Sequence, residues 1–141
     1  MSSPASPAGT YLGFDAGARR LGVAVGESLT GSARPLVTLP ARDGQPAWDR
    51  LAQLMASWEP AGLVVGLPLH ADGSDSDSSA LARRLARRLE GRYRRPVFLV
   101  DERLSSHEAE TRLAAGRQPG DRDSVAAQVI LETWFAGGAC S

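Results

Sequence analysis

The apolar positions divide the chain into short continuous runs, followed later by stripes with helical spacing. Five runs are expected to form strands: Thr10–Asp15, Leu21–Gly26, Pro35–Leu39, Leu63–Leu67 and Val97–Val100. Glycine-rich turns separate the first two runs, and this arrangement predicts an antiparallel meander of the first three strands. The fourth run is apolar throughout, which is typical of a strand that is covered on both faces.

Helical stripes accompany the later strands. Pro46 is expected to open a first helix, and the capping box Ser105-x-x-Glu108 predicts the start of a third. A last helix, from about Asp123 to Phe135, is apolar around most of its circumference and is therefore expected to be buried. The apolar stripes of the first two helices are Trp48, Leu51, Met55 and Trp58, and then Leu81, Leu85 and Leu89.

This order of elements predicts an α/β fold with a mixed five-stranded sheet. Its parts are an antiparallel three-strand meander plus two parallel strands, flanked by helices on both faces. We expect one domain over residues 10–136, a disordered leader at 1–9 and a flexible tail at 137–141. Active sites in sheets of this kind form at the carboxyl ends of the strands, so the residues that end the strands are the first to consider.

Composition narrows the class of protein. A chain of 141 residues with 43% apolar and 23% charged residues is typical of one globular domain, and not of a disordered or disulfide-stapled chain. No apolar run approaches the ~18 residues of a membrane span, and no secretory signal is visible, so we expect a cytoplasmic protein without a membrane partner. A net charge of +0 argues against a surface generally adapted to nucleic acid.

Arginine supplies every basic residue of the chain, and seven arginines fall between Arg83 and Arg95. Two readings are open for this stretch: a solvated helix face, or a track for a phosphate backbone. We favour the solvated face. The two histidines and Cys140 show no zinc-ligand spacing.

Three acids are placed where the predicted sheet would hold an active site. Asp15 ends the first strand, Glu102 directly follows the last strand, and Asp123 lies in the first turn of the last helix. Clustered carboxylates repel one another unless a cation neutralises them, and hard oxygen ligands suit Mg²⁺ or Mn²⁺. Taken alone, Asp123 is also explained as a helix cap.

Four segments carry a resemblance to a known family: Gly13–Val25; Val65–Leu69 with Asp72-Gly73; Val100–Ser106 with Glu108–Glu110; and Asp123–Ala127 followed by Val129–Leu131. In this order they resemble the motifs of the YqgF/RuvX family, over most of residues 10–135. The resemblance implies a ribonuclease H-like fold, related to Holliday-junction resolvases, and a metal-dependent nuclease that processes the 5′ end of precursor 16S rRNA.

The resemblance also implies site residues. Asp15, Glu102 and Asp123 take the catalytic role and bind one or two ions of Mg²⁺ or Mn²⁺. The candidates for substrate binding are Arg19, Arg20, Arg103 and Ser105. Arg19 is preferred as a phosphate contact because it stands in the loop beside Asp15, whereas Arg103 has two equal readings, phosphate or a nearby acid.

The implied partner is nucleic acid. Precursor rRNA is favoured and branched DNA is the alternative, with ribosomal particles as a further partner and a monomer or weak homodimer as the assembly. A resolvase for four-way DNA junctions would need a symmetric dimer to make paired cuts. A third reading, a non-catalytic nucleic-acid-binding module in ribosome assembly or transcription, is disfavoured because all three acids are present.

Overall fold

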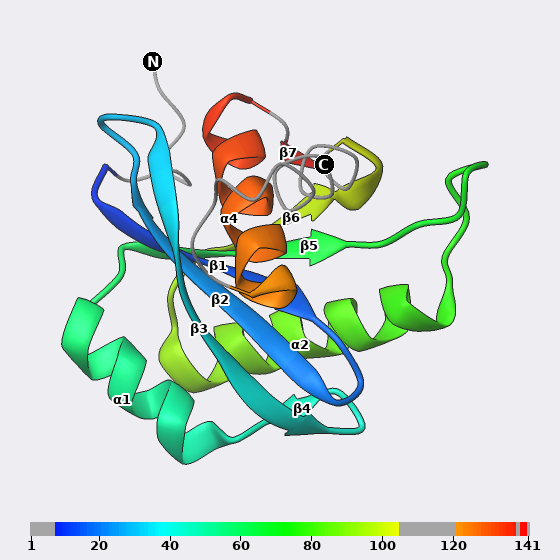
Figure 1. Cartoon of the computed structure of the whole chain (residues 1–141), viewed down its shortest axis with the longest axis horizontal. Coiled ribbons are helices and arrows are strands. Elements are labelled where there is room, and N and C mark those ends of the chain that lie inside the picture. The colour runs from blue at the N-terminus through cyan, green and yellow to red at the C-terminus, as the bar shows by residue number, and fades with distance from the viewer. Residues whose placement is uncertain (1–7, 105–120, 138, 141) are drawn as a thin grey trace.

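A single mixed sheet organises the computed structural model, which describes residues 8–104, 121–137 and 139–140 (Figure 1). Its strands lie in the order β4-β3-β2-β1-β5-β6-β7. They are β1 (Thr10–Ala16), β2 (Arg20–Glu27), β3 (Ser32–Arg42), β4 (Gln45–Pro46), β5 (Gly62–Leu67), β6 (Val97–Asp101) and β7 (Ala139–Cys140). The predicted meander and the two parallel strands are confirmed, because β1 pairs antiparallel with β2 and parallel with β5.

Two short strands at the edges extend the sheet beyond the predicted five. The strand β7 pairs with β6 and lies in the segment for which a flexible tail was expected. The strand β4 pairs with β3 across a turn in which Asp43 and Gly44 have φ of 52° and 82°. A two-residue turn with both φ positive closes a tight hairpin, and it holds Pro46 in the sheet.

The helices form one layer on each face of the sheet (Figure 1). They are α1 (Trp48–Trp58), α2 (Asp77–Tyr93), the short 3₁₀ helix η1 (Glu102–Leu104) and α4 (Arg122–Phe135). The prediction that the first helix opens at Pro46 is wrong: α1 begins at Trp48, because Pro46 belongs to the β4 hairpin. The predicted helix start at Ser105 lies outside the described residues.

Alternation along β1 divides the core in two. Leu12 and Phe14 are fully buried and face α1 and α2, whereas Tyr11 faces α4 together with Ile130 and Trp134. The expectation of a buried last helix is confirmed, since eight residues of α4 are buried. In the part of the chain that the structure describes, no helix combines the length and apolarity required to span a bilayer.

Candidate active site

Asp15 lies on the face of the sheet that α4 covers. Side chains alternate along a strand, so Asp15 points away from the core that contains Phe14. Asp15 pairs with Gly22 on β2, and Phe14 pairs with Val65 on β5. Continuing this parallel register by one residue brings Asp15 beside Gly66. The carboxylate is therefore half-buried at the centre of the sheet, near the carboxyl end of β1.

Gly22 allows the start of α4 to approach Asp15. A Cβ at Gly22 would overlap the backbone carbonyl of Asp123 and would lie 3.0 Å from its Cβ. The absence of a side chain on β2 therefore lets Asp123 rest directly on the strand, next to the residue that pairs with Asp15. A larger residue at this position would lift the first turn of α4 from the sheet.

The residue that caps α4 is Asp121. Its carboxylate accepts hydrogen bonds from the backbone N–H of Ser124 at 2.9 Å and from Thr38 Oγ1 at 2.7 Å, which ties the helix start to β3. Burial raises the pKa of Asp121, but these hydrogen bonds outweigh it and the net shift is downward. Asp121 accepts the hydrogen bond that an N-cap residue normally accepts, so the prediction that Asp123 caps the helix is wrong. The carboxylate of Asp123 is therefore available for other contacts.

Glu102 reaches the same place from β6. It follows the last residue of that strand, and its Oε2 would lie 2.8 Å from a Cβ on Gly66. Since Gly66 lies beside Asp15, the Glu102 carboxylate occupies the space that a side chain on β5 would fill. Gly66 on β5 thus leaves room for Glu102, in the same way that Gly22 on β2 leaves room for Asp123.

Two of the three acids, Asp15 and Glu102, have pKa values above the ordinary range of a carboxyl group. Burial raises the pKa of Asp15 to about 7, and repulsion from Asp123 adds to the shift. Burial likewise raises the pKa of Glu102 to about 8, with further repulsion from Asp15 and Asp101. Raised carboxyl pKa values mean that the protein disfavours negative charge here in the absence of a cation, a condition that active sites commonly show.

The chemistry of these donors fits a hard divalent cation, because all three are carboxylates. Their present geometry is not a finished metal centre: no group of three His, Cys, Asp or Glu side chains among the described residues is arranged to hold one ion. One reason is visible at Asp123, whose Oδ2 lies 2.8 Å from Arg20 Nε. Shared coordination would require Asp123 to exchange this partner.

The predicted substrate-binding residues have different surroundings. Arg19 is exposed in the turn after β1, where its backbone carbonyl accepts a hydrogen bond from the N–H of Ala41. Arg20 pairs with Asp123. Arg103 pairs with Asp101, which agrees with one of its two predicted roles, contact with a nearby acid. Ser105 lies outside the described residues.

Asp101 was missed by the sequence reasoning. Its carboxylate accepts from Arg103 Nη2 at 2.5 Å, from Nε, and from the backbone N–H of Arg103 at 2.9 Å. The bonds from Arg103 lower the pKa of Asp101 despite its partial burial. Arg103 Nη1 also donates to the carbonyl of Ala71 at 3.2 Å. The bonds from Arg103 to Asp101 join the two residues on either side of Glu102 and so hold the turn in which it lies. The spacing of an acid and an arginine two positions apart was the feature of the sequence that could have indicated this pair.

The arginine-rich stretch lies mostly on α2, on the opposite face of the sheet from α4 (Figure 1). Four of its side chains have local partners, and one of them is Arg95, whose Nε donates to the carbonyl of Pro60 at 2.7 Å. Arg83 pairs with Asp75 at 3.1 Å, Arg88 donates to Gln45 at 2.8 Å, and Arg92 lies over the Trp48 ring at 4.0 Å. These contacts favour the interpretation of a solvated, structural face.

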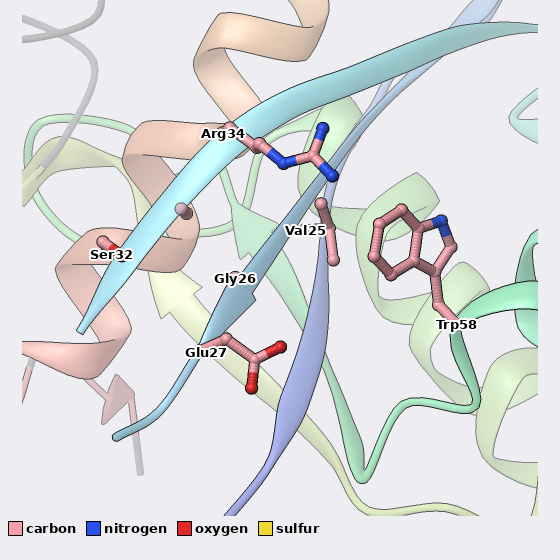
Figure 2. Close-up of a pocket in the computed structure, with 7 residues that line it drawn as sticks. Val25, Gly26, Glu27, Ser32, Arg34 and Trp58 are labelled. Atoms are coloured by element: carbon pink, nitrogen blue, oxygen red, sulfur yellow. The ribbon is translucent and has the colours of Figure 1, made fainter. Parts of the chain in front are cut away.

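A surface hollow of about 330 Å³ lies away from the acids, at the Glu27 end of β2. Figure 2 shows Trp58 facing Arg34 and Val25 across it, with Glu27 near its other end. Arg34 lies 5.3 Å from the Trp58 ring centre, so two of its walls already contact each other. This hollow and the acid cluster occupy different ends of the sheet, and we place the candidate chemistry at the acids.

Comparison with known proteins gives a consistent result. The family model described as "RuvX: Holliday junction resolvase" matches residues 9–137. A protein of Alcanivorax borkumensis with the name "Putative pre-16S rRNA nuclease" is 50% identical over 128 residues, which cover 91% of this chain and 96% of that protein. A protein of Azotobacter vinelandii with the same name is 50% identical over 130 residues, covering 89% and 92%.

Solved structures agree on the fold. The RuvC of T. thermophilus in complex with a Holliday junction substrate matches with a TM-score of 0.58 and 16% identity, covering 92% of this chain and 98% of that one. A further structure of Thermus thermophilus RuvC matches with a TM-score of 0.56 and 17% identity. The ribonuclease H-like architecture expected from the sequence is confirmed by these neighbours.

Proposed function

Because this chain belongs to the RuvX family, we propose that it is a divalent-cation-dependent nuclease that processes the 5′ end of precursor 16S rRNA. One observation carries the chemistry. Asp123 raises the pKa of the half-buried Asp15, and Asp15 raises the pKa of Glu102, which supports a shared role for these three acids from distant parts of the sequence. The names of the relatives support the choice of substrate.

In the proposed mechanism, Asp15, Glu102 and Asp123 hold one or two ions of Mg²⁺ or Mn²⁺. A bound divalent cation supplies charge stabilisation to the phosphoryl group during in-line displacement by water. Asp15 is the central ligand because it is close to both other acids. The half-buried setting of these carboxylates limits competing water and strengthens their electrostatic interactions.

The surrounding arginines have separate tasks in this proposal. Arg19 is exposed beside Asp15 and contacts a phosphate of the substrate. Arg103, bound to Asp101 and to the carbonyl of Ala71, holds the turn that presents Glu102. Ser105 remains a candidate for hydrogen bonding to the substrate. We place the protein in the cytoplasm, acting on ribosomal particles as a monomer or weak homodimer.

A cleavage assay tests the function directly. The protein is incubated with a precursor 16S rRNA fragment that keeps its 5′ extension, with Mg²⁺, with Mn²⁺ and with EDTA. We expect cleavage within the extension in either cation and none in EDTA, and loss of that cleavage in Asp15→Asn. Uncut RNA in all conditions, or equal cleavage by the variant, would contradict the proposal.

The description of the family model favours a second candidate, cleavage of four-way DNA junctions. The same assay includes a synthetic junction and a linear duplex of matched sequence. Paired symmetric cuts in the junction, with precursor rRNA left intact, would favour the resolvase. Such cuts also require a dimer, so the mass of the protein on the junction, measured by light scattering, gives an independent check.

A further inference from the structure

Arg20 holds a position that a phosphate-binding residue alone would not need. It is the first residue of β2, and its backbone carbonyl accepts a hydrogen bond from the N–H of Gly17, which closes the turn after β1. Its Nε lies 2.8 Å from Oδ2 of Asp123. The side chain therefore crosses from the sheet to the helix and brings positive charge to one of the three acids.

The ion pair between Arg20 and Asp123 is easy to break. The side chain of Arg20 is 70% exposed, while that of Asp123 is 27% exposed. An ion pair with so much solvent access contributes little to stability, because water replaces each contact that is lost. The contact uses Nε, so the two terminal nitrogens of the guanidinium can reach another group after a small rotation.

The ion pair also affects the charge balance of the acid cluster. Asp123 repels Asp15 across a half-buried space, and a cation at Asp123 relieves that repulsion. Arg20 supplies such a cation from the chain itself. A divalent ion held by the three acids needs the same carboxylate, so Arg20 and the ion compete for Asp123.

We infer that Arg20 is a displaceable counter-ion: it neutralises Asp123 until a divalent cation binds, and then it contacts a phosphate of the nucleic acid. This inference rests on the proposed function and adds the order of two events, in which the cation binds first and Arg20 then contacts the phosphate. A guanidinium binds phosphate oxygens through two parallel N–H groups, so the released side chain is well suited to this second partner. Cation binding and nucleic-acid binding then strengthen each other through Arg20.

Manganese binding to the metal-free, full-length protein tests the first half. Free Mn²⁺ is measured by electron paramagnetic resonance, with no nucleic acid present. We expect Arg20→Gln to bind Mn²⁺ at least threefold more tightly than the wild type, because the competitor of the ion has lost its charge. Arg20→Lys keeps the charge and is expected to stay within twofold of the wild type.

Arg19→Gln is the matched control for this measurement. It removes the same charge from the neighbouring position, but the structure describes no contact between Arg19 and Asp123. We expect its Mn²⁺ affinity to stay within twofold of the wild type. Equal affinities of Arg20→Gln and wild type, or weaker binding by Arg20→Gln, would overturn the inference; weaker binding would mean that Arg20 only orients Asp123.

Binding of single-stranded RNA tests the second half. A fluorescent oligonucleotide is titrated in Ca²⁺, which replaces Mg²⁺ to suppress cleavage, and again in EDTA. In Ca²⁺ we expect Arg20→Gln to bind at least threefold more weakly, with a salt slope reduced by about 0.7. In EDTA the variant and the wild type should bind alike, because Arg20 is then engaged by Asp123. Equal losses in both conditions would overturn the inference.

Asp123→Asn separates the failure of this inference from the failure of the proposed function. If wild-type Mn²⁺ binding depends on Asp123 but is unchanged in Arg20→Gln, the cation site stands and only the role of Arg20 falls. If Mn²⁺ binds neither the wild type nor any variant, the cation site and the proposed function fall together. Circular dichroism on each variant confirms that it is folded.

Discussion

The two ends of the β1–β2 ladder contain similar residues in very different surroundings. At one end Asp15 pairs with Gly22, and at the other Thr10 pairs with Glu27. Each end has an acid, an arginine on a neighbouring strand or turn, and a glycine. The Glu27 end also has a hollow, between Arg34 and Trp58. A second hollow, lined by Pro40 and Gln45 among others, lies toward the Asp15 end, so shape alone does not choose between the two ends.

Burial makes the difference between these ends. Glu27 is exposed, and its carboxylate accepts a hydrogen bond from Thr10 Oγ1 at 2.6 Å. Asp15 is half-buried beneath the start of α4, and two further acids approach it. A carboxylate in water gains little from a cation, whereas clustered, desolvated carboxylates gain much more. The close approach of α4 at Gly22 therefore brings Asp123 near Asp15 and produces the repulsion between these two acids.

The largest expected effect is the loss of cleavage when Asp15 is neutralised, compared with the neutralisation of Glu27 at the other end. Asp15→Asn keeps the size of the side chain but loses the anionic oxygen, so we expect rRNA cleavage to fall by about 10³-fold or more, to background. Glu27→Gln is the matched control and is expected to keep activity within about twofold. The rates are measured under single-turnover conditions. Similar losses in both variants would remove the distinction between the two ends.

A side chain at Gly22 tests whether the approach of α4 builds the site. The Cβ of Gly22→Ala would overlap the backbone of Asp123, so we expect a loss of about 1–3 kcal/mol in unfolding free energy and a sharp drop in cleavage. Gly91→Ala, on an exposed part of α2 with open space around it, is expected to gain about 0.5–1 kcal/mol. Chemical denaturation measures both. A neutral Gly22→Ala would contradict the packing argument.

The third prediction concerns stability and pH in the presence of EDTA. Burial, together with repulsion from Asp123, raises the pKa of Asp15 to about 7 in the folded protein, from an ordinary value of 3.8. Between these values the folded state holds a proton that the unfolded state has lost, so stability falls as pH rises from about 4 to 7. At pH 8 we therefore expect Asp15→Asn to be about 1–3 kcal/mol more stable than the wild type.

Unfolding curves at pH 5 and pH 8 measure this effect. At pH 5 the gain from Asp15→Asn should shrink, because most of the wild-type carboxyl is then protonated in the folded state. Glu27→Gln should show no such dependence on pH. A variant that is less stable than the wild type at pH 8 would mean that Asp15 stabilises the fold as a charged group.

The smallest effect is expected at the hollow. Arg34→Gln removes the cation above Trp58, a contact worth about 0.5–1 kcal/mol at an exposed site. We expect that loss in stability and an unchanged rate of rRNA cleavage. A large drop in cleavage, with the fold intact by circular dichroism, would show that substrate reaches this end of the sheet as well.

Some of these features could be predicted from the sequence, and the others could not be predicted for physical reasons. Short apolar runs predicted the five main strands, and the motifs that contain Asp15, Glu102 and Asp123 made these acids the candidates for the site. Capping chemistry could not distinguish Asp121 from Asp123, because aspartate suits both the cap and the first turn of a helix. The bond from Thr38 to Asp121 decides the matter, and it joins residues that are 83 positions apart.

The partners of the arginines were the least predictable part. Arg19 and Arg20 are adjacent in the sequence, but only Arg20 pairs with Asp123, because the turn after β1 and the position of α4 determine which side chain reaches the helix. The contact of β4 with β3 was missed for a similar reason: two residues are too short to show a period. Such features depend on tertiary contacts, and local patterns do not encode them.

Anomalous diffraction from Mn²⁺-soaked crystals tests the central claim most directly, since it locates the ion without relying on activity. The account predicts an anomalous peak between the carboxylates of Asp15 and Glu102, with Asp123 turned from Arg20 toward the ion. The same crystals of Glu27→Gln should show the same peak, and those of Asp15→Asn should lose it. Manganese bound at the Glu27 end of the sheet, or a peak that persists in Asp15→Asn, would contradict the account.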